Sequence, residues 1–116
     1  MVLGHTKCGA IKGAVNNVKL GNLTHLLDKV QPAVAATTKT CAHMNLSEGD
    51  FTDAVASTNV RLVADQITEN SPILKEMLLA GDIGIVCSMY NVESGVVEFY
   101  DDAVTMFEHV KGLEYA

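Results

Sequence analysis

The chain has 116 residues, of which 48% are hydrophobic, so its length and composition suit one small domain with a compact core. Its formal net charge of −6 argues against nucleic-acid binding, which requires a basic face. No apolar run reaches about 18 residues, so the sequence predicts no membrane span. The amino terminus lacks the features of a signal peptide, and the cysteines are odd in number and irregularly spaced. We therefore expect reduced thiols in a cytoplasmic protein.

The first part of the chain predicts a short strand followed by helices. Residues 1–4 are typical of a strand, and apolar side chains recur at helical spacing over residues 9–18. A second amphipathic helix is predicted over residues 23–30, with Asn22 as its N-cap. Pro32 should end this helix at the residue before it, because proline disfavours the helical conformation there.

The middle of the chain predicts a loop and then two further helices. Residues 33–36 could extend a second helical piece, and residues 37–40 and 45–49 are expected to be loop. Ser47 is a candidate cap for a long helix that continues to residue 70. Ser71-Pro72 then starts another helix, because a capping side chain followed by proline at the first helical position is favoured.

The last part of the chain predicts a hairpin. Gly81 ends the preceding helix, and residues 83–90 form the strongest strand, apolar enough to be covered on both faces. Residues 96–100 form the second strand of the hairpin. Asp101-Asp102 is expected to open a last helix, because acids suit the positive end of the helix dipole. Three apolar residues would face inward from this helix: Val104, Phe107 and Val110.

This order of elements predicts an α/β fold, organised as a single domain over residues 1–116. The expected sheet is small and mostly parallel, with a C-terminal hairpin and flanking helices. So few strands leave open edges, and such edges must be paired or covered. The sequence therefore predicts either a symmetric partner or a further segment.

His5 and Cys8 are the residues best suited to chemistry. They lie three positions apart where a strand is expected to pass into a helix, so both side chains could point at one metal ion. Zinc is bound by imidazole nitrogen and thiolate sulfur, usually with four ligands. Two donors alone hold zinc weakly, and the alternative is a buried thiol at a helix start beside a histidine at a strand end.

The stretch around this pair, Gly4-His5-Thr6-Lys7-Cys8-Gly9-Ala10, resembles the second zinc-binding motif of the β-class carbonic anhydrases. The resemblance continues along the chain, in the order and at about the spacing of that family's C-terminal half. It covers four further stretches: Asn59-Val60, Ser71 to Leu74, Ile83 to Val92 and Ser94 to Val97. The resemblance implies a β-carbonic-anhydrase-like fold, with the N-terminal strands of the family sheet missing.

The resemblance also implies a metal site. In the family, one histidine and two cysteines hold Zn²⁺, and His5 and Cys8 match the histidine and the second cysteine. Zinc lowers the pKa of water to about 7, and the hydroxide attacks carbon dioxide to form bicarbonate. The first cysteine belongs to a Cys-x-Asp-x-Arg motif, which occurs nowhere in this sequence. The only arginine, Arg61, falls within the long predicted helix, so the catalytic set is incomplete.

Other candidate donors have simpler explanations. Cys41 and His43 could complete four ligands if they folded back near His5 and Cys8, but a loop thiol and a surface imidazole are favoured. Cys87 is predicted to be buried, because free cysteine behaves as a small hydrophobe. The remaining histidines, His25 and His109, are expected on helices, solvated or partly packed. Four acids are better explained as caps and helix-start charges than as a catalytic pair: Asp50, Asp53, Asp101 and Asp102.

Two kinds of function remain open. The first is a carbonic anhydrase-like enzyme that hydrates carbon dioxide, with weak or no activity as a lone chain. The second is a non-catalytic α/β module that keeps a remnant zinc site and forms a homodimer or a larger homo-oligomer. A longer native protein, extending before Met1, would instead carry the full site. Members with this scaffold also process other small linear molecules, such as carbon disulfide, and the sequence does not choose among these substrates.

Overall fold

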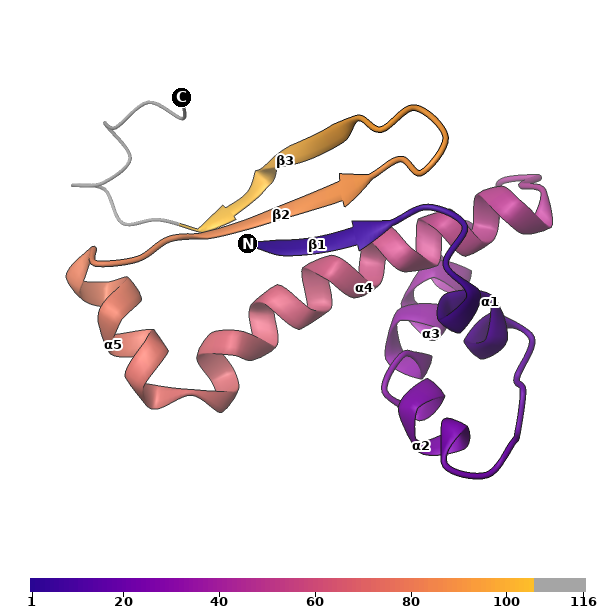
Figure 1. Cartoon of the computed structure of the whole chain (residues 1–116), viewed down its shortest axis with the longest axis horizontal. Helices are drawn as coiled ribbons and strands as arrows, with labels where there is room; N and C mark the ends of the chain where they lie inside the picture. The colour runs from indigo at the N-terminus through magenta and orange to yellow at the C-terminus, as the bar shows by residue number, and fades with distance from the viewer. Residues whose placement is uncertain (106–116) are drawn as a thin grey trace.

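The computed structural model describes residues 1–105, and in Figure 1 the helices lie below a small mixed sheet, with α4 running beneath β1 and β2. The strands have the order β1-β2-β3. β1 (Val2–His5) is parallel to β2 (Ile85–Tyr90), and β2 is antiparallel to β3 (Val97–Thr105). The predicted α/β fold with a C-terminal hairpin is therefore confirmed.

The predicted helix from Asp101 is wrong over residues 101–105, which continue β3. The antiparallel ladder passes a register shift and then pairs Thr105 with Ile85. Cross-strand pairing thus outweighs the preference of the two acids for a helix start, and the β-branched Val104 and Thr105 suit a strand. The rest of the predicted helix lies outside the described residues, with Phe107, His109 and Val110.

The first two helices are shorter than the sequence predicts. α1 (Gly9–Val15) ends three residues before the predicted end at Val18. Asn17, just after the helix, takes a left-handed backbone conformation with φ of 56°. α2 (Leu23–Asp28) begins after the predicted N-cap residue, Asn22, although the Asn22 side chain makes no capping hydrogen bond. Pro32 does not end a helix at Gln31 but lies in the first turn of α3 (Gln31–Thr40), where its missing N–H is not needed.

The prediction of a loop over residues 37–40 is also wrong, because α3 continues to Thr40. Threonine hydroxyls within α3 donate to carbonyl oxygens four residues earlier, Thr37 to Ala33 and Thr38 to Val34, at 2.7 and 2.8 Å. The Thr37 side chain is buried, and its Oγ1 also lies within hydrogen-bond distance of Thr58 Oγ1 on α4, at 2.9 Å. Tertiary packing of Thr37 therefore holds a helix that the local composition disfavours.

The long helix α4 (Glu48–Asn70) and α5 (Pro72–Ala80) begin at the predicted serine caps. Asp50 N–H donates to Ser47 Oγ at 3.1 Å, and Leu74 N–H donates to Ser71 Oγ at 3.2 Å. Gly81 ends α5 with a left-handed φ of 81°, as predicted. None of the helices in residues 1–105 has the length and apolar character that a membrane crossing requires.

Two apolar clusters form the core, and α4 contributes to both. One lies among α1, α2, α3, the first half of α4 and the end of β2, and the other among the second half of α4, α5 and the start of β2. Cys87 is 1% exposed in the second cluster, which confirms its predicted burial. β1 lies against α4 at Gly4, where an added Cβ would come within 2.6 Å of Val60 Cγ2. This close approach fixes the strand that carries His5.

Candidate functional site

His5 and Cys8 bracket the connection from β1 to α1, called here the His5–Cys8 loop (residues 5–8). His5 is the last residue of β1 and is exposed, with Nδ1 at 2.8 Å from the Thr6 carbonyl oxygen. In the tautomer with the proton on Nδ1, this nitrogen donates to the carbonyl and Nε2 is left available as a ligand. Metal-binding histidines are commonly oriented by such a bond from the other ring nitrogen.

Cys8 is the residue before the first turn of α1. Its backbone is extended, with φ of −71° and ψ of 121°, and its side chain makes no capping hydrogen bond. The thiol is partly buried and packs against the core cluster of α1 to α4. The loop therefore offers one exposed imidazole and one half-buried thiol, both of which are zinc-binding groups.

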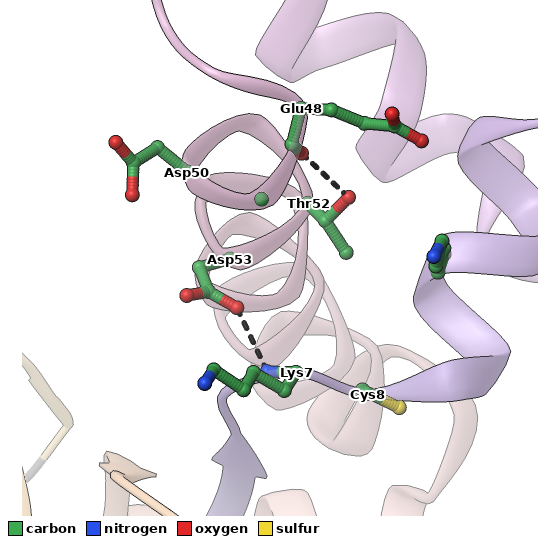
Figure 2. A pocket seen from close by; sticks show the side chains of 8 residues that line it. Lys7, Cys8, Glu48, Asp50, Thr52 and Asp53 are labelled. Atoms are coloured by element: carbon green, nitrogen blue, oxygen red, sulfur yellow. Dashed lines mark hydrogen bonds between the residues drawn. The ribbon is translucent and has the colours of Figure 1, made fainter. Parts of the chain in front are cut away.

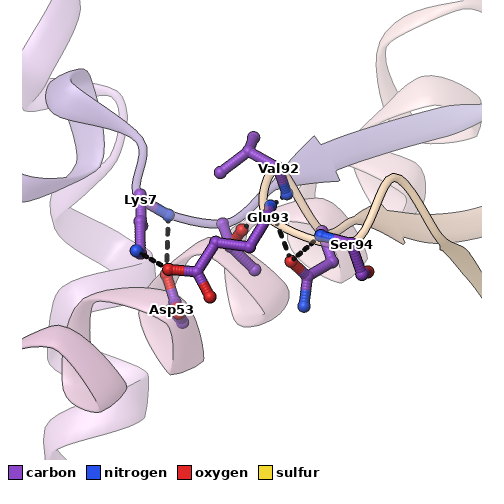
Figure 3. Close-up of polar contacts among 7 residues, drawn as sticks. Lys7, Asp53, Val92, Glu93 and Ser94 are labelled. Carbon is purple, nitrogen blue, oxygen red and sulfur yellow. Dashed lines mark hydrogen bonds and ion pairs between the residues drawn. The ribbon is translucent and has the colours of Figure 1, made fainter.

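The middle of the loop is anchored on α4 through Lys7 (Figure 2). Lys7 has a left-handed φ of 54°, which L-residues with a side chain rarely adopt. Its backbone N–H donates to Asp53 Oδ1 at 2.9 Å. Its ammonium group forms an ion pair with Glu93 (Figure 3). Lys7 thus joins the loop to a helix and to the β2–β3 turn.

Thr6 anchors the loop on the sheet. Its N–H donates to the Tyr90 carbonyl at 3.0 Å, and its Oγ1 accepts from Val92 N–H at 3.1 Å. In the β2–β3 turn, Asn91 Oδ1 accepts from the N–H groups of Glu93 and Ser94 (Figure 3). The turn that meets Thr6 and Lys7 is therefore itself held by hydrogen bonds.

A cavity of about 450 Å³ lies beside the loop, between it and the start of α4 (Figure 2). The lining carries both signs of charge, from two lysines and three acids. The residues that line it are Lys7, Cys8, Lys12, Glu48, Gly49, Asp50, Thr52 and Asp53. The sequence explains Asp53 only as a helix-start charge, and its contact with Lys7, 46 residues away, has no local signal.

The other sequence candidates are not gathered at this loop. Cys41 is the C-cap residue of α3, and His43 is exposed in the turn after it. His25 is exposed on α2. Within residues 1–105, no group of three or more histidine, cysteine, aspartate or glutamate side chains is arranged to hold a metal ion. Cys41 and His43 therefore do not complete a four-ligand site with His5 and Cys8 in this structure.

Arg61 lies away from the loop, on α4. Its guanidinium carbon lies 4.8 Å from the centre of the Tyr100 ring, and the Tyr100 hydroxyl accepts from Ser57 Oγ at 3.0 Å. This cluster joins β3 to α4 and gives Arg61 a cation–π contact. Arg61 therefore has a structural explanation within the fold.

Comparison with known proteins identifies the family to which this geometry corresponds. A family model described as "Carbonic anhydrase" matches residues 1–97. The β-carbonic anhydrase CafA of Aspergillus fumigatus is 27% identical, with a TM-score of 0.73 over 95% of this chain and 51% of that one. No curated protein sequence matches the chain.

Two further solved structures share the fold at lower identity. A Coccomyxa β-carbonic anhydrase in complex with acetazolamide is 22% identical, with a TM-score of 0.75 over 99% of this chain and 52% of that one. One of two tetrameric β-carbonic anhydrases from Sordaria macrospora is 17% identical, with a TM-score of 0.74 over 85% of this chain and 50% of that one. The chain thus spans about half the length of the solved structures it matches.

Proposed function

Because the chain belongs to the β-carbonic anhydrase family, we propose that it is a carbonic anhydrase-like protein in which His5 and Cys8 contribute two ligands to Zn²⁺. The reaction is the reversible hydration of carbon dioxide to bicarbonate, with weak or no activity as a lone chain. The observation that carries this proposal is the His5–Cys8 loop: a histidine and a cysteine at the β1–α1 connection, within the part of the chain that the family model matches.

The donor chemistry of the loop fits zinc as part of a ligand set. His5 would bind through Nε2 while Nδ1 is held on the Thr6 carbonyl, and Cys8 would bind as thiolate. When bound, zinc makes water acidic enough to supply hydroxide near neutral pH. His5 and Cys8 would hold the ion, and the contacts of Thr6 and Lys7 keep the loop in place against α4 and the β2–β3 turn.

Low activity is expected because a catalytic zinc site normally has three protein ligands and one open position. His5 and Cys8 supply two, and residues 1–105 hold no third donor beside them. The remaining ligands would come from a second chain, a preceding segment of a longer protein, or solvent. The three reduced thiols suit a cytoplasmic location, which we include in the proposal.

Stopped-flow carbon dioxide hydration with added Zn²⁺ tests the enzymatic part. We expect a rate close to that of buffer for the purified chain. A rate well above buffer that a chelator abolishes would contradict the expected inactivity. A Co²⁺ titration tests the metal role separately, since thiolate coordination by Cys8 should give a charge-transfer absorption that His5→Ala weakens and Cys8→Ser removes. Absence of any Co²⁺ binding by the native chain would contradict the metal role.

The second candidate is a self-associating module, favoured by the edges of the sheet. Among the described residues, β1 and β3 each have one edge without a partner strand. Large apolar side chains are also exposed on β3 and α5, including Phe99 at 54% and Ile73 at 71%. An open edge is a template for pairing with another chain. Sedimentation should show a dimer or larger homo-oligomer, and a folded monomer at micromolar concentration would contradict this candidate.

A further inference from the structure

We propose that Asp53 is a positioning residue for the His5–Cys8 loop. Its carboxylate accepts the hydrogen bond of the Lys7 backbone amide and thereby sets the directions in which His5 and Cys8 present their donor atoms. The inference deepens the metal-binding role proposed above and rests on it. Asp53 contacts the loop, not the ion, so its effect on a metal passes through the backbone.

Lys7 lies in the turn that joins β1 to α1. Lys7 occupies the left-handed region, with φ of 54°, and it carries a side chain, so this conformation persists only where the surroundings hold it. The Asp53 carboxylate is one of these restraints, and it acts on the peptide between His5 and Cys8. A change of backbone angle at Lys7 would alter the relative orientation of the two donor residues.

The position of Asp53 is set by the packing of α4 on β1. Gly4 of β1 lies against Val60 of α4. Lys7, three residues after Gly4, is hydrogen-bonded to Asp53, which is seven residues before Val60. As the chain passes from β1 into the loop, its contacts move toward the start of α4, so β1 and α4 run in opposite directions here. The close approach at Gly4 and the hydrogen bond at Lys7 therefore both hold this part of the chain against α4.

Asp53 is itself well supported. It lies in the second turn of a helix of 23 residues, between the buried Thr52 and the buried Val55. A carboxylate on such a rigid element holds a loop more firmly than one on another loop. The sheet side of the loop is fixed separately, by Thr6 on the Tyr90 carbonyl and the Val92 amide. Asp53 therefore supplies the helix-side restraint on the loop backbone.

Three variants test this inference on the full chain. Asp53→Ala removes the acceptor, and we expect about a tenfold or greater loss of Co²⁺ affinity, the range usual when a supporting residue of a metal site is removed. Asp53→Asn keeps an oxygen acceptor and should retain affinity close to that of the native chain. Asp50→Ala is the matched control, because Asp50 lines the same cavity and the substitution also removes one acid from the start of α4. It should change the affinity less than twofold.

The readouts are the Co²⁺ dissociation constant and the intensity of the thiolate charge-transfer band. Amide hydrogen exchange of Lys7 in the metal-free chain provides a second measurement, and it should become faster in Asp53→Ala but not in Asp50→Ala. Asp53→Glu, which keeps the charge and suits a helix, replaces Asp53→Ala if the latter does not fold. It should also weaken binding, because the longer side chain displaces the carboxylate.

The outcomes separate the two proposals. If the native chain binds Co²⁺ and Asp53→Ala or Asp53→Glu binds it equally well, the positioning role is wrong and the metal role stands. If the native chain binds no Co²⁺, both the metal role and the positioning of a metal site are wrong. Equal loss of affinity in Asp50→Ala and Asp53→Ala would assign the effect to charge alone and would also overturn the inference.

Discussion

At the scale of single residues, Gly4 is a point of close approach between β1 and α4. A Cβ there would lie 2.6 Å from Val60 Cγ2, so Gly4→Ala should force the strand away from the helix. We expect a loss of about 1–3 kcal/mol in the free energy of unfolding, as for other overpacked core positions. Urea denaturation measures this loss.

Gly9→Ala is the matched control for Gly4→Ala. A Cβ at Gly9 would meet nothing within 4 Å, and Gly9 is the first residue of α1. Because alanine favours helix over glycine by up to about 1 kcal/mol, this variant should be neutral or slightly stabilised. Equal destabilisation of the two variants would contradict the steric explanation.

Tyr100 provides a second test at this scale. Tyr100→Phe removes the hydroxyl that accepts from Ser57 Oγ but keeps the ring beneath Arg61. We expect a loss of about 1 kcal/mol in the free energy of unfolding. Tyr100→Leu also removes the ring and should lose more, because the cation–π contact disappears. Thermal or urea denaturation of both variants measures the difference, and identical losses would argue against a contribution from the ring.

The residues of the loop could be predicted only in part from the sequence. His5 and Cys8 stand out because their types and spacing suit a metal. Asp53 does not stand out in the sequence, because its contact with Lys7 depends on how α4 lies against β1. The left-handed conformation of Lys7 is likewise a product of the surroundings, since lysine has no local preference for it.

At the scale of elements, the serine caps are the clearest link between sequence and structure. Ser71→Ala removes the acceptor for Leu74 N–H at the start of α5 and should cost about 1 kcal/mol in the free energy of unfolding. Ser71→Gly should cost only a few tenths of a kcal/mol, because glycine is itself tolerated at this position. Urea denaturation distinguishes the two, and a larger loss for glycine than for alanine would contradict the capping role.

The elements that the sequence mispredicts are those that depend on distant partners. Thr37 lies within α3 because its hydroxyl bonds to both Ala33 and Thr58, the second of which lies on another helix. Residues 101–105 are strand because β2 provides a pairing edge. Local composition favours loop in the first case and a helix start in the second, and tertiary contacts outweigh both preferences.

At the scale of the whole molecule, the two core clusters are apolar and involve α4 throughout. We therefore expect folding to be largely independent of metal, unlike that of zinc fingers. Removal of metal by EDTA should lower the midpoint of thermal unfolding by no more than about 2 °C, since a ligand that binds the folded state weakly adds little to its stability. Circular dichroism with added Zn²⁺ or EDTA measures the shift.

His5→Ala provides the control for that measurement, because it should abolish any shift that Zn²⁺ produces. Unfolding of the native chain by EDTA at room temperature would show that metal holds the fold together and would contradict this view of the core.

The family fold could be predicted from the sequence because its motifs are spread from the β1–α1 connection to the β2–β3 hairpin. The sequence does not predict how many metal donors the fold brings together, because this number depends on where the turns after α3 and β1 lie in space. Within residues 1–105, Cys41 and His43 do not join His5 and Cys8 in a group that could hold a metal ion.

The parallel pairing of β1 with β2 also constrains the order in which the chain can fold. Val2 and Ser88, which are joined by a hydrogen bond, are 86 residues apart. Closing a loop of that length costs about 4 kcal/mol of chain entropy. On a ribosome, the His5–Cys8 loop would leave the exit tunnel well before the β2–β3 turn that holds it in place through Thr6 and Lys7. The nascent chain would thus expose an unstructured thiol and imidazole until that turn had also been synthesised.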